Sequence, residues 1–103
     1  MYAVIFEVTP DPARADEYFD LAAELRPELQ NIDGFISIER FQSMADETRY
    51  VSLSFWRDED AIAQWRGHLG HAAAQEKGKA GIFKDFRIRV AKVERDYSLA
   101  DRV

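Results

Sequence analysis

Two histidines and two tryptophans, the side chains best suited to chemistry in this sequence, all lie between Ser54 and Gln75. His71 is the first candidate for catalysis, because a neutral imidazole can accept a proton near neutral pH. Gln75 lies one helical turn further along, so it shares a helix face with His71. A half-exposed polar residue that caps a helix end is the alternative interpretation of His71.

Trp65 is the main candidate for the wall of a substrate pocket. Its spacing also fits a core aromatic residue on an amphipathic helix, and a pocket wall in a small domain can be both. Gln75 serves as a polar anchor for the substrate, and Phe55 and Ile5, on two predicted strands, complete the substrate-binding candidates. Trp56 ends a predicted strand, and we interpret it as structural.

A metal site and an anion site are weaker candidates. His68 and His71 form an H-x-x-H pair, but no cysteine and no obvious third ligand accompany them, so no metal is expected. Three strand arginines could orient an anionic substrate through bidentate hydrogen bonds, or could pair with acidic residues across a sheet. These arginines are Arg40, Arg87 and Arg89, and the acidic residues are Glu7, Glu39 and Asp85.

Six elements that could position these residues follow from the hydrophobic pattern. Asp58 is a predicted N-cap for the helix that carries Trp65, and Gly67 and Gly70 predict a break in that helix near His68. A kink is expected around Pro27. The predicted strands are 2–8, 35–42, 49–56 and 82–97, and the predicted helices are 13–31 and 58–77 with its break.

The order β-α-β-β-α-β predicts a ferredoxin-like α+β fold in one domain, residues 1–103, with a four-stranded antiparallel sheet. Right-handed crossovers place both helices on one face of that sheet. Because the strands carry apolar residues on both faces, something must cover the second face, and a second copy of the chain is the simplest cover. The sequence therefore predicts a homodimer.

Composition excludes several function classes. The formal net charge of −5 argues against a nucleic-acid-binding surface, which needs clustered Lys and Arg. The chain has no cysteine, and therefore no disulfide, thiolate metal site or thiol nucleophile. No apolar run approaches the roughly 18 residues of a membrane span, and the first residues read as a strand rather than a signal peptide. A soluble cytoplasmic protein that does not bind membranes is expected.

Several of these features together resemble the antibiotic biosynthesis monooxygenase family of dimeric α+β-barrel proteins. The matching features are Gly34-Phe35, the strand-ending Trp56 before an acidic helix start, Trp65-Arg66, His71 and the last strand RIRVAKVERDY. The resemblance covers nearly the whole chain. It implies a small monooxygenase that oxidises an aromatic or quinol-like molecule without a cofactor, in a pocket between the helices and the sheet. The alternative is a non-catalytic ligand-binding dimer of the same fold.

The haem-degrading branch of this family offers a third, weaker possibility. That branch has a Trp on its second helix, an iron-ligating His ten residues later, and an Asn on the first strand. Trp65 matches the Trp, but Gln75 stands ten residues beyond it, and the first-strand position falls near Ile5.

Overall fold

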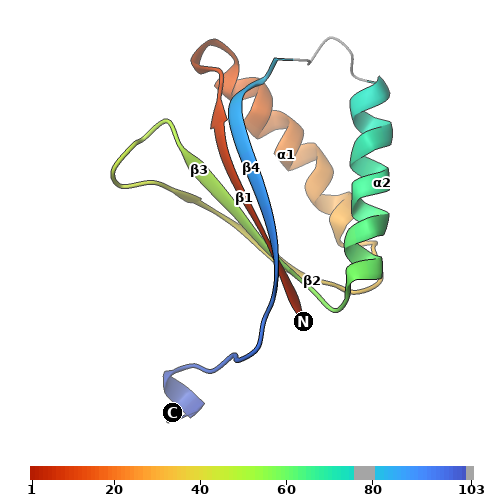
Figure 1. The fold of residues 1–103 in the computed structure, drawn as a ribbon. Coiled ribbons are helices and arrows are strands. Elements are labelled where there is room, and N and C mark those ends of the chain that lie inside the picture. The colour runs from red at the N-terminus through yellow and green to blue at the C-terminus, as the bar shows by residue number, and fades with distance from the viewer. Residues whose placement is uncertain (76–80, 102–103) are drawn as a thin grey trace.

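A computed structural model describes residues 1–75 and 81–101, with the side chains of residues 68–75 outside the description. It contains a four-stranded antiparallel sheet in the spatial order β2-β3-β1-β4 (Figure 1). This topology confirms the predicted ferredoxin-like fold. The strands are β1 (Tyr2–Pro10), β2 (Phe35–Gln42), β3 (Tyr50–Trp56) and β4 (Phe83–Lys92).

Both α-helices lie on the same side of the sheet (Figure 1). No helix in the described ranges is long and apolar enough to cross a membrane. The short 3-10 helix η1 (Pro12–Arg14) leads into α1 (Ala15–Leu29), α2 (Glu59–Gln75) follows β3, and a 3-10 turn, η3 (Leu99–Asp101), lies near the C-terminus.

The helix α2 runs without interruption, so the predicted break near His68 was wrong. Gly67 lies within this helix, and no heavy atom would lie within 4 Å of a β-carbon added to it. A glycine costs a helix only about 1 kcal/mol relative to alanine. The packing of the first two turns against the sheet outweighs that cost.

The last strand also differs from its prediction, since β4 ends at Lys92 and not near Tyr97. Beyond it the chain leaves the sheet and extends away from the body of the molecule (Figure 1). One backbone hydrogen bond, from Val93 N–H to the Met1 carbonyl oxygen, continues the pairing of β4 with β1 for a single residue.

Two apolar clusters fill the space between the helices and the sheet. The first joins the end of α1, the end of β3 and the start of α2. The second joins the start of α1 to the other end of the sheet. The buried members of the first are Leu29, Trp56, Ala61 and Ile62, and those of the second are Val8, Tyr18 and Ile82.

A bulge at the start of β2 changes which residues face the helices. The register against β3 shifts between Phe35 and Ser37, so strict alternation fails there. Phe35 and Ile38 therefore both pack against the first apolar cluster. Strict alternation would have placed Phe35 and Ile38 on opposite faces of the sheet, and the bulge brings both to the helix side.

Gly34, in the turn before β2, is expected to be intolerant of substitution. Its φ is +97°, and an added β-carbon would lie 2.8 Å from the Ala61 β-carbon. Backbone strain and overpacking together predict that Gly34→Ala lowers the free energy of unfolding by about 2–4 kcal/mol. Chemical denaturation measures this change. Gly67→Ala is the control and should stabilise the protein slightly, and equal effects of the two substitutions would contradict the argument.

Candidate functional site

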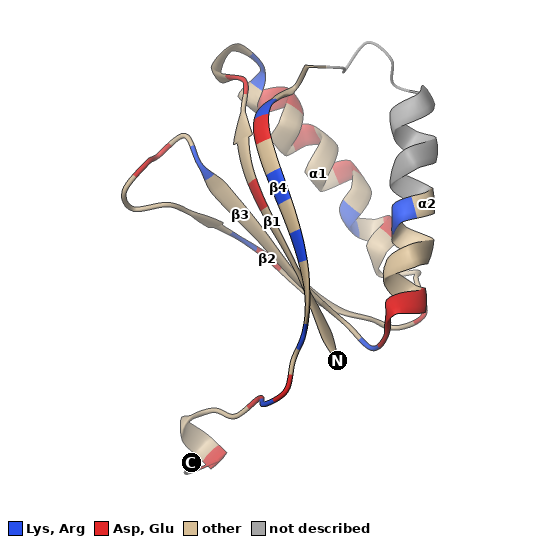
Figure 2. Ribbon diagram, viewed as in Figure 1, with Lys and Arg blue, Asp and Glu red and all other residues tan. Residues whose placement is uncertain are grey.

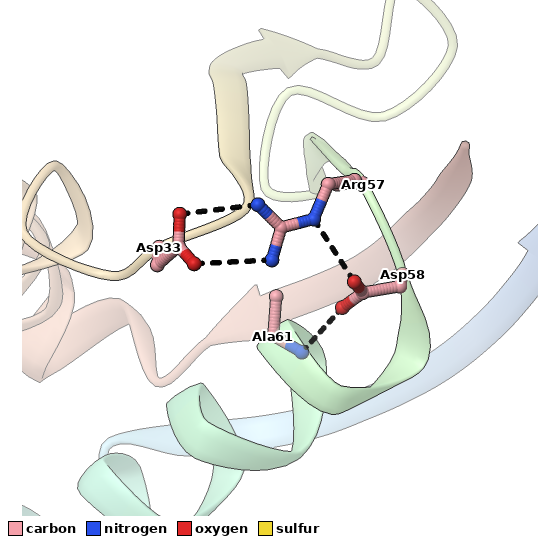
Figure 3. Close-up of polar contacts among 4 residues, drawn as sticks. All are labelled: Asp33, Arg57, Asp58 and Ala61. Atoms are coloured by element: carbon pink, nitrogen blue, oxygen red, sulfur yellow. Dashed lines mark hydrogen bonds and ion pairs between the residues drawn. The ribbon is translucent and has the colours of Figure 1, made fainter.

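The start of α2 is fixed by a small polar network (Figure 3). The Ala61 N–H donates to Oδ1 of Asp58 at 2.9 Å, which confirms Asp58 as the N-cap. Arg57 Nε donates to the other oxygen of Asp58 at 3.0 Å. The same guanidinium donates to both oxygens of Asp33, at 3.1 and 3.2 Å. The loop before β2 is thereby tied to the loop before α2.

This network also holds its carboxylates ionised at neutral pH. The hydrogen bonds from Arg57 lower the pKa of Asp33 below its ordinary value. The backbone hydrogen bond from Ala61, followed by the one from Arg57, lowers the pKa of Asp58. Their contacts indicate that both acids position the start of α2.

Trp56 and Trp65 bring β3 and α2 together. Trp56 is fully buried, and its indole N–H donates to the Ser54 hydroxyl at 2.9 Å. Trp65 is partly buried and stacks on Trp56, with ring centroids 6.5 Å apart and an interplanar angle of 30°. Trp56 is structural, as the sequence predicted. Trp65 packs against the core while part of its ring stays accessible, which keeps it available as a pocket wall.

Ile5 and Phe55 lie on the face of the sheet opposite the helices. In β1, Tyr2 and Val4 pack against the helix-side cluster, and Ile5 follows Val4 with the alternate orientation. Phe55 likewise lies between the buried helix-side residues Ser54 and Trp56. Neither residue therefore lies between the helices and the sheet of its own chain. Their roles in substrate binding stay predictions.

The other sequence candidates fall where the structure gives less detail. The helix α2 includes His68, His71 and Gln75, but their side chains lie outside the described residues. Their predicted roles therefore stay predictions.

One cavity of about 190 Å³ opens on the helix side, between α1 and the β2–β3 edge of the sheet. Its walls combine apolar side chains with two arginines, one from α1 and one from β2. Trp65 does not line it. The lining residues are Phe19, Ala22, Ala23, Arg26, Leu29, Ile38, Glu39, Arg40 and Ser52.

Arg26 was missed as a site residue in the sequence, although a signal was present. Ala22, Arg26 and Leu29 follow one another at intervals of four and three, so they share a face of α1. A charged residue in the middle of an apolar stripe is unusual and can indicate a polar group at the edge of a pocket.

The residues that line this cavity include no imidazole, thiolate or phenolate that could ligate the iron of haem, which one branch of the resembling family uses. The side chains of both histidines lie outside the described residues. The cavity is also smaller than the roughly 300–1,000 Å³ of pockets that enclose a whole small molecule. Similarly, the described side chains contain no cluster of three or more potential metal ligands among His, Cys, Asp and Glu.

The sheet order and the two helices on one face define a ferredoxin-like α+β domain, and a small cavity opens on its helix side. A sequence model of one family, described as antibiotic biosynthesis monooxygenase, matches residues 1–77. The chain belongs to this family.

A curated relative from Pyricularia oryzae, named jasmonate monooxygenase ABM, is 48% identical over 93 residues. The match covers 90% of this chain but 43% of the relative, so the chain spans less than half of that protein's length.

Solved structures of low sequence identity share the fold. A Deinococcus radiodurans protein of the antibiotic biosynthesis monooxygenase type superposes with a TM-score of 0.79 at 12% identity, covering 95% of this chain and 97% of that one. SnoaB (mutant N63A), a cofactor-independent oxygenase from Streptomyces nogalater, gives 0.72 at 17% identity, with 92% and 94% covered. The haem-degrader MhuD from Mycobacterium tuberculosis, with two haems bound, gives 0.73 at 16%, with 95% and 100% covered.

Proposed function

We propose that this chain is a small monooxygenase that oxidises an aromatic or quinol-like molecule without a cofactor. One observation carries the proposal: a relative that is 48% identical over 93 residues is named a monooxygenase. The fold-level likeness to a cofactor-independent oxygenase is consistent with it. Such chemistry requires a base near an electron-rich ring and a pocket that excludes water, and α2 carries the base candidate.

The reaction needs no reductant from outside. His71 takes a proton from the substrate and leaves an electron-rich anion that reacts with molecular oxygen. In an anthrone a ring methylene is then converted to a carbonyl, and a hydroquinone is converted to the hydroxylated quinone. In both cases one oxygen atom enters the product and the other is released as water. Both electron pairs needed to reduce the oxygen come from the substrate, so the balance closes without flavin, haem or metal. Trp65 would pack against the aromatic ring, and Gln75 would hold a polar substituent.

Oxygen uptake tests this proposal directly. The purified protein should consume oxygen with members of a panel of hydroquinones, anthrones and jasmonate, the last because of the relative's name. Uptake should continue after treatment with a chelator and without added flavin or haem. A protein that binds members of the panel but consumes no oxygen with any of them is instead a non-catalytic ligand-binding member of the fold.

The proposal includes a homodimer formed through the face of the sheet that the helices leave uncovered. Its centre is apolar and only partly buried in one chain, with Ile5, Leu53 and Phe55 side by side on β1 and β3. Phe41 at the edge of this face is 44% exposed. Basic residues recur along β4 (Figure 2). At the edge of the uncovered face, Arg89 on β4 forms an ion pair with Glu7 on β1 at 3.0 Å. Covering this face in a dimer would bury on the order of 1,000 Å² or more.

Sedimentation should therefore give the mass of two chains at low micromolar concentration. Leu53→Glu places a charge at the centre of the uncovered face and should dissociate the dimer, because an unpaired buried charge is costly. Met44→Glu is the matched control, since Met44 lies fully exposed on the β2–β3 loop. A folded wild-type protein with the mass of one chain would refute the dimer.

A further inference from the structure

Two arginines line the helix-side cavity, Arg26 from α1 and Arg40 from β2. The other two arginines considered in the sequence analysis lie on the opposite face of the sheet. Arg87 and Arg89 pair in register with Glu7 and Ile5, so they lie on the uncovered face of the sheet, and Arg89 is bound to Glu7. Arg40 pairs in register with Ser52 and points to the helix side. Of the three strand arginines proposed from the sequence, only Arg40 lines the cavity, and Arg26 from α1 is the second arginine there.

Neither Arg26 nor Arg40 has an acidic partner within the part of the chain that the structure describes. Arg26 makes one long contact, from Nη2 to the Ile38 carbonyl oxygen at 3.4 Å. That distance is beyond the usual 2.7–3.2 Å range of such hydrogen bonds. A stronger acceptor could therefore replace it at little cost.

The guanidinium of Arg40 is held in place by aromatic rings. Its central carbon lies 5.3 Å from the centre of the Tyr18 ring and 5.7 Å from that of Phe19. Tyr18 is buried, so one of the two rings beside Arg40 is itself fixed. A guanidinium that contacts an aromatic ring can keep N–H groups free to bind an anion. A side chain ordered in advance loses less entropy when a ligand binds.

The remaining walls are mostly apolar. Phe19, Ala22, Leu29 and Ile38 line the cavity, and Ser52 adds a nearly buried hydroxyl. Glu39 is the one acid among the lining residues, but it pairs in register with Leu53, on the uncovered face of the sheet. The local charge inside the cavity is therefore positive, although the whole chain carries a net charge of −5.

We propose that this cavity is a subsite for the anionic end of the substrate, with Arg26 and Arg40 binding a carboxylate whose attached carbons lie against the apolar walls. Two guanidiniums from opposite walls suit the planar carboxylate, and bonds between these groups are charge-assisted. The volume of about 190 Å³ fits one end of a small molecule and not the whole of it. Leu29 is a buried member of the first apolar cluster, against which Ile38 and Trp65 both pack, so the reacting ring would lie towards α2.

Binding tests this inference separately from turnover, although naming the ligand as the substrate rests on the proposed function. Calorimetry would compare 3-phenylpropanoate with its neutral analogue 3-phenylpropanol and with inorganic phosphate. The carboxylate should bind about tenfold tighter than the alcohol or more, as expected for charge-assisted hydrogen bonds. Equal affinity for the alcohol, or for phosphate without an apolar body, would overturn the inference.

Substitutions locate the effect. Arg26→Gln and Arg40→Gln should each weaken carboxylate binding about tenfold and leave alcohol binding unchanged. Arg40→Lys keeps the charge but loses the fork and the stack, so its loss should be intermediate. Arg49→Gln, on the β2–β3 loop away from the cavity, removes the same charge and should have no effect. A loss of equal size in Arg49→Gln would show that only net charge matters, and would refute the subsite.

The two proposals fail in different ways. Carboxylate binding that depends on Arg26 and Arg40, without oxygen uptake on any substrate, supports the subsite and contradicts the monooxygenase. Oxygen uptake that is unchanged in both arginine variants, with carboxylates and neutral substrates alike, supports the monooxygenase and contradicts the subsite. When the monooxygenase activity and the carboxylate subsite are both present, Arg40→Gln should raise KM for carboxylate substrates and leave kcat nearly unchanged.

Discussion

Trp56→Ala is expected to lower the free energy of unfolding by about 3–5 kcal/mol, the usual range for removing a large buried aromatic residue. The Trp56 side chain is 0% exposed and packs edge-on against Phe35 and in a stack against Trp65. Its removal would leave a cavity between the end of β3 and the start of α2. It would also leave the buried Ser54 hydroxyl without its indole partner. Urea denaturation followed by circular dichroism measures the loss.

Two further variants separate packing from hydrogen bonding. Trp56→Phe keeps much of the volume but removes the indole N–H, so its cost should lie between those of wild type and Trp56→Ala. Trp65→Ala should cost less than Trp56→Ala, because Trp65 is only partly buried. If Trp65→Ala proves the more damaging substitution, α2 packs on the sheet more tightly than the structure shows.

The local features of the fold were predictable because they depend on neighbouring residues. Asp58 caps α2 through the Ala61 N–H three residues later, a contact that sequence spacing alone specifies. The turn at Gly34 follows from the positive φ that glycine tolerates. The strand order then followed from the alternation of elements and the handedness of crossovers.

Features that depend on tertiary packing were not predictable in the same way. Continuity of α2 through Gly67 reflects the packing of its first turns, which outweighs the low helix propensity of one glycine. The bulge after Phe35 reverses which residues of β2 face the helices, and no residue in the sequence marks it.

The candidate site was predicted only in part for the same reason. A strand shows which residues share a face, but not which face the helices cover, so the sequence did not show that Ile5 and Phe55 lie on the uncovered face. Arg40 was recognised as a possible anion ligand together with Arg87 and Arg89, although the sheet places these on opposite faces. The pairing of Arg40 with Arg26 requires α1 to cross the β2–β3 edge, which is a long-range feature.

His71→Ala is expected to have the largest effect on activity, if oxygen uptake is found. Loss of a general base typically slows a reaction by a factor of about 10²–10⁴. An imidazole acts as a base only in its neutral form, so wild-type uptake should rise with pH through the range in which histidines titrate and then level off. His71→Ala should abolish that rise, because no group in the same position then changes its protonation state. Oxygen-electrode rates across this pH range, with one hydroquinone substrate, measure both effects.

His68→Ala is the matched control, since it removes the other histidine from the same helix. It should leave both the rate and the pH profile unchanged, and both variants should melt within a few degrees of wild type. A His71→Ala protein that keeps the wild-type pH profile would exclude His71 as the base. Loss of the profile in His68→Ala alone would transfer the role to His68. If neither histidine matters, the proton leaves the substrate to solvent, and the contribution of the protein is to bind the ring and exclude water.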